Sequence, residues 1–194
     1  MKHPVIKKYF FLLILIFFFC CSAPAQIQVS GVNMPQKLTY IENEPLALFG
    51  TGARTFLWMD MYVGAIFLNE SNLKANAIIE ANESMALRLH ILSSFVSNKR
   101  IIKAIQNGFN EATDGNLKAY EQRIDKMISF FNDDIKPNDI IDLVYKTSGH
   151  TSVYRNARLL GNIDGLDFKQ ALFAVWLSDK AVDQGFKKDL LKGI

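Results

Sequence analysis

Arg54 is the residue whose type and position most clearly call for a chemical explanation. It is the only charged residue in the apolar run LALFGTGARTFLW of residues 46–58. A guanidinium left unpaired inside an apolar sheet is costly, so it needs a partner or access to water. Two interpretations stay open: an edge position or structural carboxylate partner, and the charged floor of an apolar pocket for an anionic head group. Gly50 and Gly52 favour the pocket slightly, because strand glycines let a backbone or a ligand approach closely.

Other signs of catalysis or metal binding are weak. His90 and His150 are the only histidines after residue 25, and no cysteine accompanies them, so a usual structural zinc site is excluded. The sequence has no nucleophile elbow, zincin motif or P-loop. The acidic stretch 132–134 lacks the spacing of a calcium loop, and residues 162–167 fit a turn followed by a helix N-cap. The sequence therefore predicts no metal and no cofactor.

The first 25 residues have the pattern of a secretory signal peptide. A head with three lysines precedes an apolar run over residues 9–21, and small residues follow before the expected cleavage point. The run is too short to span a bilayer. We expect residues 1–25 to be removed, leaving residues 26–194 as an exported, periplasmic domain. Lipidation at Cys20 is less favoured, because Phe19 stands where a small residue is needed.

The charge balance argues against nucleic acid and anionic surfaces as partners. The chain has 22 basic and 19 acidic side chains, and three of the basic ones lie in the predicted signal peptide. The remaining domain is therefore neutral, with 22 − 3 = 19 basic and 19 acidic residues. No basic excess is left to drive binding to nucleic acid or to an anionic membrane surface.

Hydrophobic periodicity predicts alternating groups of strands and helices within one domain. Strands are expected over 27–29, 37–40, two within 46–68 joined by a turn at 58–60, then 84–92, 140–145, 152–155 and 158–163. Helices are expected over 73–80, 99–111 and 116–131, from Asp167 with a capping box to Gln170, and in a last short segment around Phe186. This order predicts an α+β fold with an antiparallel sheet and helices gathered on one face.

Three segments together resemble the chalcone isomerase-like family, and most of all its exported bacterial branch. They are FGTGAR at 49–54, MYVGAIFL at 61–68 and LLGNIDGLDFKQAL at 159–172. The likeness extends over roughly residues 30–190. It implies an open-faced β-sandwich, in which a large antiparallel sheet is covered on one face by helices and a ligand cleft lies between them.

The resemblance implies two functions. Plant isomerases of the family cyclise chalcones to flavanones, whereas related members bind fatty acids through an arginine and a tyrosine. Arg54 lies at the position of that arginine, and Tyr62 lies where the isomerases have threonine. We therefore expect a non-catalytic binder of a fatty acid or similar amphiphilic carboxylate. The alternative is an isomerase, an intramolecular lyase in which Arg54 stabilises the enolate oxygen of a phenolic substrate.

Departures from the isomerase pattern favour the binder. Val175 takes the place of a hydroxyl residue, and residues 97–108, where the catalytic tyrosine and asparagine are expected, contain no tyrosine. Asn98 and Asn107 lie in this stretch, but the sequence assigns neither to the catalytic position. An accessory protein that works through a partner surface is a third interpretation. Bulky side chains could also fill the cleft, and these are Phe56, Trp58, Phe67 and Trp176.

Overall fold

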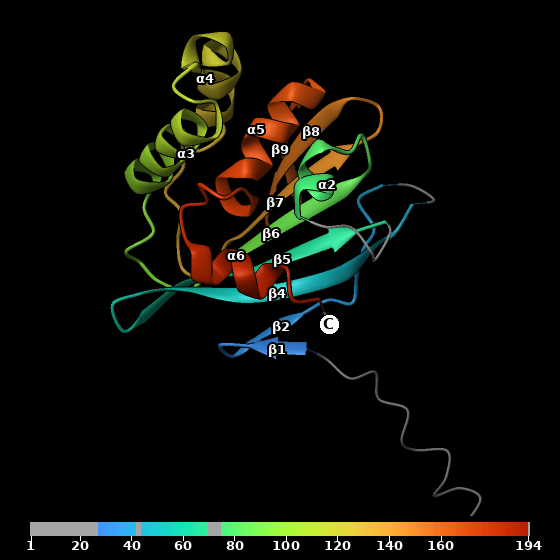
Figure 1. Cartoon of the computed structure of the whole chain (residues 1–194). Coiled ribbons are helices and arrows are strands. Elements are labelled where there is room, and N and C mark those ends of the chain that lie inside the picture. The colour runs from blue at the N-terminus through green and yellow to red at the C-terminus, as the bar shows by residue number, and fades with distance from the viewer. Residues whose placement is uncertain (1–26, 42–43, 70–74, 194) are drawn as a thin grey trace, which may run out of the picture.

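The computed structural model describes residues 27–41, 44–69 and 75–193, so the predicted signal peptide lies outside the described residues. Its centre is a seven-stranded antiparallel sheet in the order β3-β4-β5-β6-β7-β8-β9 (Figure 1). The strands are β3 (Lys37–Leu38), β4 (Leu46–Phe56), β5 (Met59–Leu68), β6 (Met85–Ile91), β7 (Ile140–Lys146), β8 (His150–Arg155) and β9 (Arg158–Asp164). Each strand of this sheet pairs with its neighbours in sequence, so the sheet is an ordered meander.

The helices cover one face of this sheet, and a small hairpin lies on the other (Figure 1). The helices are α2 (Ala75–Glu80), α3 (Asn98–Ala112), the 3₁₀ helix η1 (Leu117–Ala119), α4 (Glu121–Ser129), α5 (Leu166–Leu177) and α6 (Gln184–Leu190). The hairpin consists of β1 (Ile27–Val29) and β2 (Val32–Met34). Each face has its own buried apolar cluster, and the larger one lies on the helix side. The predicted α+β architecture with helices on one face is confirmed.

Helix α5 is the central element of the helix layer. Nine of its residues are buried, from Phe168 to Leu177, so the helix is enclosed on nearly all sides and not only along one stripe. Its contact with α3 is close: a Cβ built on Gly108 would lie 2.5 Å from a methyl carbon of Val175. A glycine in the middle of α3 is therefore explained by the packing of α5.

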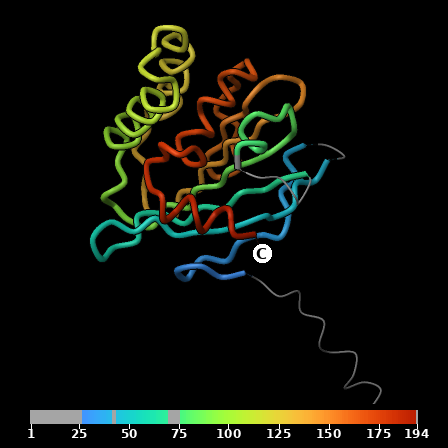
Figure 2. Tube along the Cα trace, in the orientation of Figure 1, coloured from blue at the N-terminus to red at the C-terminus, as the bar shows by residue number. Residues whose placement is uncertain are grey.

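Helix α6 lies directly on β4 and β5, as the trace in Figure 2 also shows. A Cβ on Gly50 would lie 2.1 Å from the carbonyl oxygen of Leu190, and one on Gly64 would lie 2.3 Å from Cζ of Phe186. These strand glycines are thus needed for the close approach of a helix to the sheet. Asp183 begins the helix, because its carboxylate accepts a hydrogen bond of 2.9 Å from the backbone N–H of Phe186.

Most predicted elements are present, with shifts at their ends. The strand expected over 84–92 is β6, and the turn expected at 58–60 lies at Leu57 and Trp58. Strand β2 was not predicted from the sequence. The helix expected over 73–80 is α2, and residues 73 and 74 of the expected range lie outside the described residues.

Two expectations about helices were wrong. The helix expected over 116–131 is divided at Tyr120 into η1 and α4. The capping box at Asp167 does not form, because α5 begins at Leu166 with Gly165 as its N-cap. The Asp167 carboxylate is instead held by the Arg123 guanidinium through hydrogen bonds of 2.7 and 2.8 Å. A cross-helix ion pair has therefore replaced the local cap.

The packing of α6 on the sheet gives a first prediction. Gly64→Ala should destabilise the domain by about 1–3 kcal/mol, because the added methyl group overlaps the Phe186 ring. Phe186→Leu shortens that side chain, so the double variant should lose less than the two single losses added together. Urea unfolding of the four proteins measures this coupling. Strictly additive losses would show that Gly64 and Phe186 do not constrain one another.

Candidate functional site

The sheet brings Arg54 and Tyr62 side by side. They are register partners on β4 and β5, and the guanidinium carbon of Arg54 lies 5.7 Å from the centroid of the Tyr62 ring. Partners in an antiparallel pair present their side chains on the same face of the sheet. The Tyr62 side chain packs in the helix-side cluster, so the pair lies beneath α5 and α6. The two residues that the sequence pointed to therefore form one local group.

Arg54 has an incomplete ion pair. Its Nε lies 3.7 Å from a carboxylate oxygen of Asp183, which is beyond hydrogen-bond distance. The same Nε is buried and has no hydrogen-bond partner among the described residues. The Arg54 side chain is nevertheless 30% exposed, so part of it reaches solvent. A structural carboxylate partner does exist, as one interpretation of the sequence expected, but it leaves a donor unused.

Tyr62 is buried beside two aromatic side chains. Its hydroxyl accepts a hydrogen bond of 3.3 Å from the indole N–H of Trp176, and its ring meets that of Phe186 edge-on at 5.3 Å. Burial raises the pKa of Tyr62, while the charge of Arg54 and the indole N–H oppose that rise. The phenol is therefore protonated at neutral pH. Its oxygen is already used as an acceptor, and the hydrogen bonds among the described residues give its proton no acceptor.

The glycines near Arg54 do not face a ligand space in this structure. Gly50 lies against the backbone of α6, and a Cβ on Gly52 would lie 2.8 Å from Cβ of Asp189. The sequence allowed either a backbone or a ligand to approach these glycines, and the structure shows helix α6 there, with its backbone at Gly50 and mainly its side chains at Gly52.

Val175, which takes the place of an isomerase hydroxyl residue, and the two asparagines of the stretch 97–108 have contacts away from the pair. Val175 is buried against Gly108 of α3. The Asn98 side chain holds the connection before β7, donating to the carbonyls of Phe131 and Asp133 at 2.7 and 2.9 Å and accepting from the N–H of Ile135. Asn107 is exposed on α3. These side chains do not supply polar groups to the Arg54–Tyr62 pair.

The bulky residues that could fill the cleft behave differently from one another. Trp176 is buried and contacts the Tyr62 hydroxyl, so it occupies space directly beside the candidate site. Phe67 packs in the cluster on the opposite face. Phe56 and Trp58 are largely exposed at the end of the β4–β5 hairpin. Trp176 and Phe186 of α6 therefore cover Tyr62, while part of Arg54 reaches solvent.

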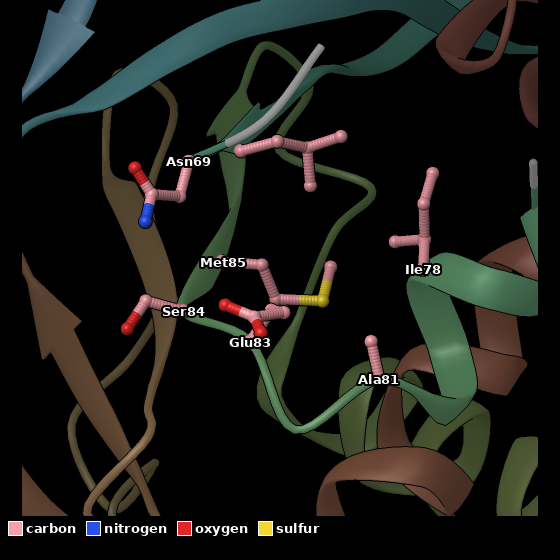
Figure 3. Close-up of a pocket in the computed structure, with 7 residues that line it drawn as sticks. Asn69, Ile78, Ala81, Glu83, Ser84 and Met85 are labelled. Carbon is pink, nitrogen blue, oxygen red and sulfur yellow. The ribbon is translucent and has the colours of Figure 1, made fainter. Parts of the chain in front are cut away.

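A small cavity beside α2 is too small for an organic ligand. Its volume is about 10 Å³, which is room for about one water molecule. Figure 3 shows Ile78, Ala81 and Met85 on its apolar side, with Asn69 and Ser84 contributing polar atoms. We therefore do not assign it a ligand.

A larger cavity, of about 300 Å³, lies on the far face between the β1–β2 hairpin and the sheet. It is lined in part by Arg88 and His90. Arg88 is already bound by the Asp142 carboxylate through two hydrogen bonds of 2.7 and 2.9 Å, and Tyr40 donates to the same carboxylate at 2.6 Å. Burial lowers the pKa of His90. The charges at this cavity are thus already paired or neutral.

No group of three or more metal-binding side chains gathers within the ranges that the structure describes. In the same ranges, no helix has the length and apolar character needed to cross a membrane.

Lys169 is a buried charged residue that we did not predict from the sequence. Its side chain is fully buried on α5, and its ammonium donates to the carbonyls of Ile78, Ile79 and Ala81 at 2.7–2.8 Å. Burial lowers the pKa of Lys169 to about 8, with a smaller opposing effect from Glu83, so the amine is charged at neutral pH. The sequence signal for its burial is the helical spacing that places Lys169 on the same helix face as Phe173 and Trp176.

The fold and the Arg54–Tyr62 pair define the class of the protein. It is an α+β open-faced sandwich with an arginine–tyrosine pair beneath its helix layer. A family model described as chalcone isomerase-like matches residues 25–192. The chain therefore belongs to the chalcone isomerase-like family.

A solved structure with the same fold is the fatty-acid-binding protein of Arabidopsis thaliana. It aligns with a TM-score of 0.69 and 18% sequence identity, covering 86% of this chain and 96% of that one. A comparison with curated proteins gives no match. The structural likeness shows a shared fold.

The buried ammonium gives a second prediction. Lys169→Met should lower the free energy of unfolding by about 1–3 kcal/mol, because it leaves the last carbonyls of α2 without donors. Hydrogen exchange in α2 should become faster as well. Lys103→Met, on an exposed position of α3, is the control and should change stability by less than about 0.5 kcal/mol. Equal effects of the two substitutions would contradict a role for Lys169 in holding α2.

Proposed function

We propose that this protein is a non-catalytic binder of a fatty acid or a similar amphiphilic carboxylate, with Arg54 and Tyr62 at the head group. The observation that carries the proposal is the buried Nε of Arg54, which has no hydrogen-bond partner among the described residues. Leaving such a donor unsatisfied is unfavourable unless another group completes it. The fatty-acid-binding protein of the same fold supports this assignment.

The chemistry of the two side chains fits an acceptor-only head group. Arg54 offers N–H donors, and the protonated Tyr62 hydroxyl has its own hydrogen to donate. A carboxylate accepts hydrogen bonds from both and matches the charge of the guanidinium. The Asp183 carboxylate is the counterion of Arg54 in this structure, at 3.7 Å from its Nε. A ligand carboxylate therefore competes with Asp183 for the guanidinium.

The apolar tail would supply most of the affinity. Each buried methylene is worth about 0.8 kcal/mol, so a twelve-carbon tail contributes roughly 8 kcal/mol before ordering costs. The charged hydrogen bond adds only about 1.5–3 kcal/mol. Because Trp176 and Phe186 now fill the space beside Tyr62, we infer that α6 and the Trp176 side chain shift to admit the tail.

Export and membership of the exported bacterial branch are part of the proposal. They rest on the first 25 residues, whose pattern predicts a signal peptide. Binding would then take place in the periplasm.

Ligand extraction tests the proposal and gives the third prediction. Residues 26–194, denatured and analysed by mass spectrometry, should release a fatty acid or another amphiphilic carboxylate in near-stoichiometric amount. Arg54→Ala should weaken carboxylate binding by about 10–150-fold, which corresponds to the loss of one charged hydrogen bond. Arg158→Ala, at an exposed arginine of β9, is the matched control and should retain the ligand.

Two outcomes would contradict the proposal. One is a folded protein that binds no added fatty acid in a thermal-shift titration. The other is equal retention of the ligand by Arg54→Ala and by the parent protein. Cyclisation of a 2′-hydroxychalcone by the parent protein, lost in Arg54→Ala, would instead support the isomerase.

A fourth prediction concerns the internal competitor. Asp183→Asn removes the charge near Arg54 but keeps a good N-cap for α6. Fatty-acid affinity should rise about two- to fivefold, because the partly exposed ion pair no longer opposes the ligand carboxylate. A titration with a fatty acid and with its methyl ester measures the effect, which should be confined to the free acid. An equal change for both would show that Asp183 acts through α6 packing and not through charge.

A further inference from the structure

The tip of the β4–β5 hairpin exposes three large apolar side chains in succession. Phe56 is 60% exposed, Leu57 is 73% exposed and Trp58 is 86% exposed. Phe56 pairs with Met59, so Leu57 and Trp58 form the turn itself. The hairpin projects beyond the rest of the sheet at the end opposite α2 (Figures 1 and 2). The most exposed aromatic residue of the described chain thus lies on a protrusion.

Folding alone does not explain these residues. Leu57 has a φ of +58°, in the left-handed region that asparagine or glycine adopts more readily. A two-residue hairpin turn is usually built from such residues, and a leucine there is strained. The side chains at the turn bury little surface in return. Their chemistry therefore suggests contact with something outside the domain.

A fourth apolar side chain lies beside the hairpin. Phe95 is 52% exposed in the connection between β6 and α3. That connection is held against β5, because the N–H groups of Leu92 and Ser93 both donate to the carbonyl of Met61 and the Ser93 hydroxyl contacts the sulfur of Met59. We call Phe56, Leu57, Trp58 and Phe95 the apolar tip.

Basic side chains stand next to the apolar tip. Lys99, Arg100 and Lys103 are exposed in the first turns of α3. The Arg100 guanidinium lies 5.3 Å from the centroid of the Phe95 ring and donates to the Phe95 carbonyl at 2.6 Å. The acidic group nearest the turn in sequence, Asp60, is engaged by the Thr55 hydroxyl at 2.6 Å. Cations therefore flank the aromatic side chains.

We propose that the apolar tip docks the protein on a lipid surface, with Leu57 and Trp58 entering the interfacial region. Aromatic and leucine side chains flanked by lysine and arginine are the combination that lies at membrane interfaces. A convex turn is suited to insertion between head groups, whereas protein partners usually bury a broad surface of about 800 Å² on each side.

The neutral charge of the domain sets the mode of docking. Residues 26–194 have equal numbers of acidic and basic side chains, so attraction over long distances is weak. Apolar insertion must supply most of the binding, and the basic residues of α3 add to it on anionic lipid. This inference does not depend on the proposed ligand, because the apolar tip and the Arg54–Tyr62 pair are different residues.

Vesicle flotation tests the docking. The described elements lie within residues 27–193, so residues 26–194 are used. Vesicles of phosphatidylcholine alone should carry the protein, and vesicles with about 30% phosphatidylglycerol should carry more. Leu57→Ser combined with Trp58→Ser should reduce binding to both at least tenfold. Leu159→Ser, at a 49% exposed leucine of β9, is the matched control and should bind as the parent does.

Fluorescence gives a second readout. Trp58 and Trp176 are the only tryptophans, and Trp176 is buried, so a blue shift that vesicles cause in the parent protein and not in the tip variant reports Trp58. Lys99→Glu with Arg100→Glu should remove the gain from phosphatidylglycerol and spare binding to phosphatidylcholine. Circular dichroism confirms that each variant is folded. The proposal is overturned if the parent protein does not float, if the tip variant floats as the parent does, or if the tip substitutions change only self-association in gel filtration.

Discussion

The close approach of α6 to the sheet is the contact on which the candidate site depends. Glycines at positions 50 and 64 remove the side chains that would otherwise hold the helix away. The approach places Phe186 edge-on to Tyr62 and brings Asp183 within 3.7 Å of Arg54. The packing of α6 on the sheet therefore also places the counterion of Arg54. A ligand must displace the apolar contacts of Phe186 as well as the Asp183 carboxylate.

Two strand arginines show how a structural charge differs from a candidate binding group. Arg88 faces its register partner Asp142, forms two short hydrogen bonds with it and shares that carboxylate with Tyr40. Arg54 has one carboxylate beyond hydrogen-bond distance and a buried donor without a partner among the described residues. Both are strand arginines near apolar surfaces, so residue type and sequence context alone do not separate them. Their partners do.

The sequence was most informative where neighbouring residues decide the structure. The alternation over 84–92 predicted β6, because one strand face is buried. It failed where distant residues decide. Asp167 has a cap-like sequence context but pairs with Arg123, 44 positions earlier. The Arg54–Tyr62 pairing followed from the family resemblance, whereas the partners that surround the pair emerge only from the three-dimensional packing.

The donors at the site suit any oxygen that carries negative charge, so they serve both a bound carboxylate and a developing enolate. The two differ in what else must be held. A cyclisation also needs polar groups that position a phenolic nucleophile. Val175, at the position of one of them, packs on Gly108, and Asn98 of the stretch 97–108 holds the chain before β7. The raised pKa of Tyr62 makes its hydroxyl a donor and a poor base. An acceptor-only head group uses the donors of both Arg54 and Tyr62, once Asp183, Trp176 and Phe186 give way to the ligand.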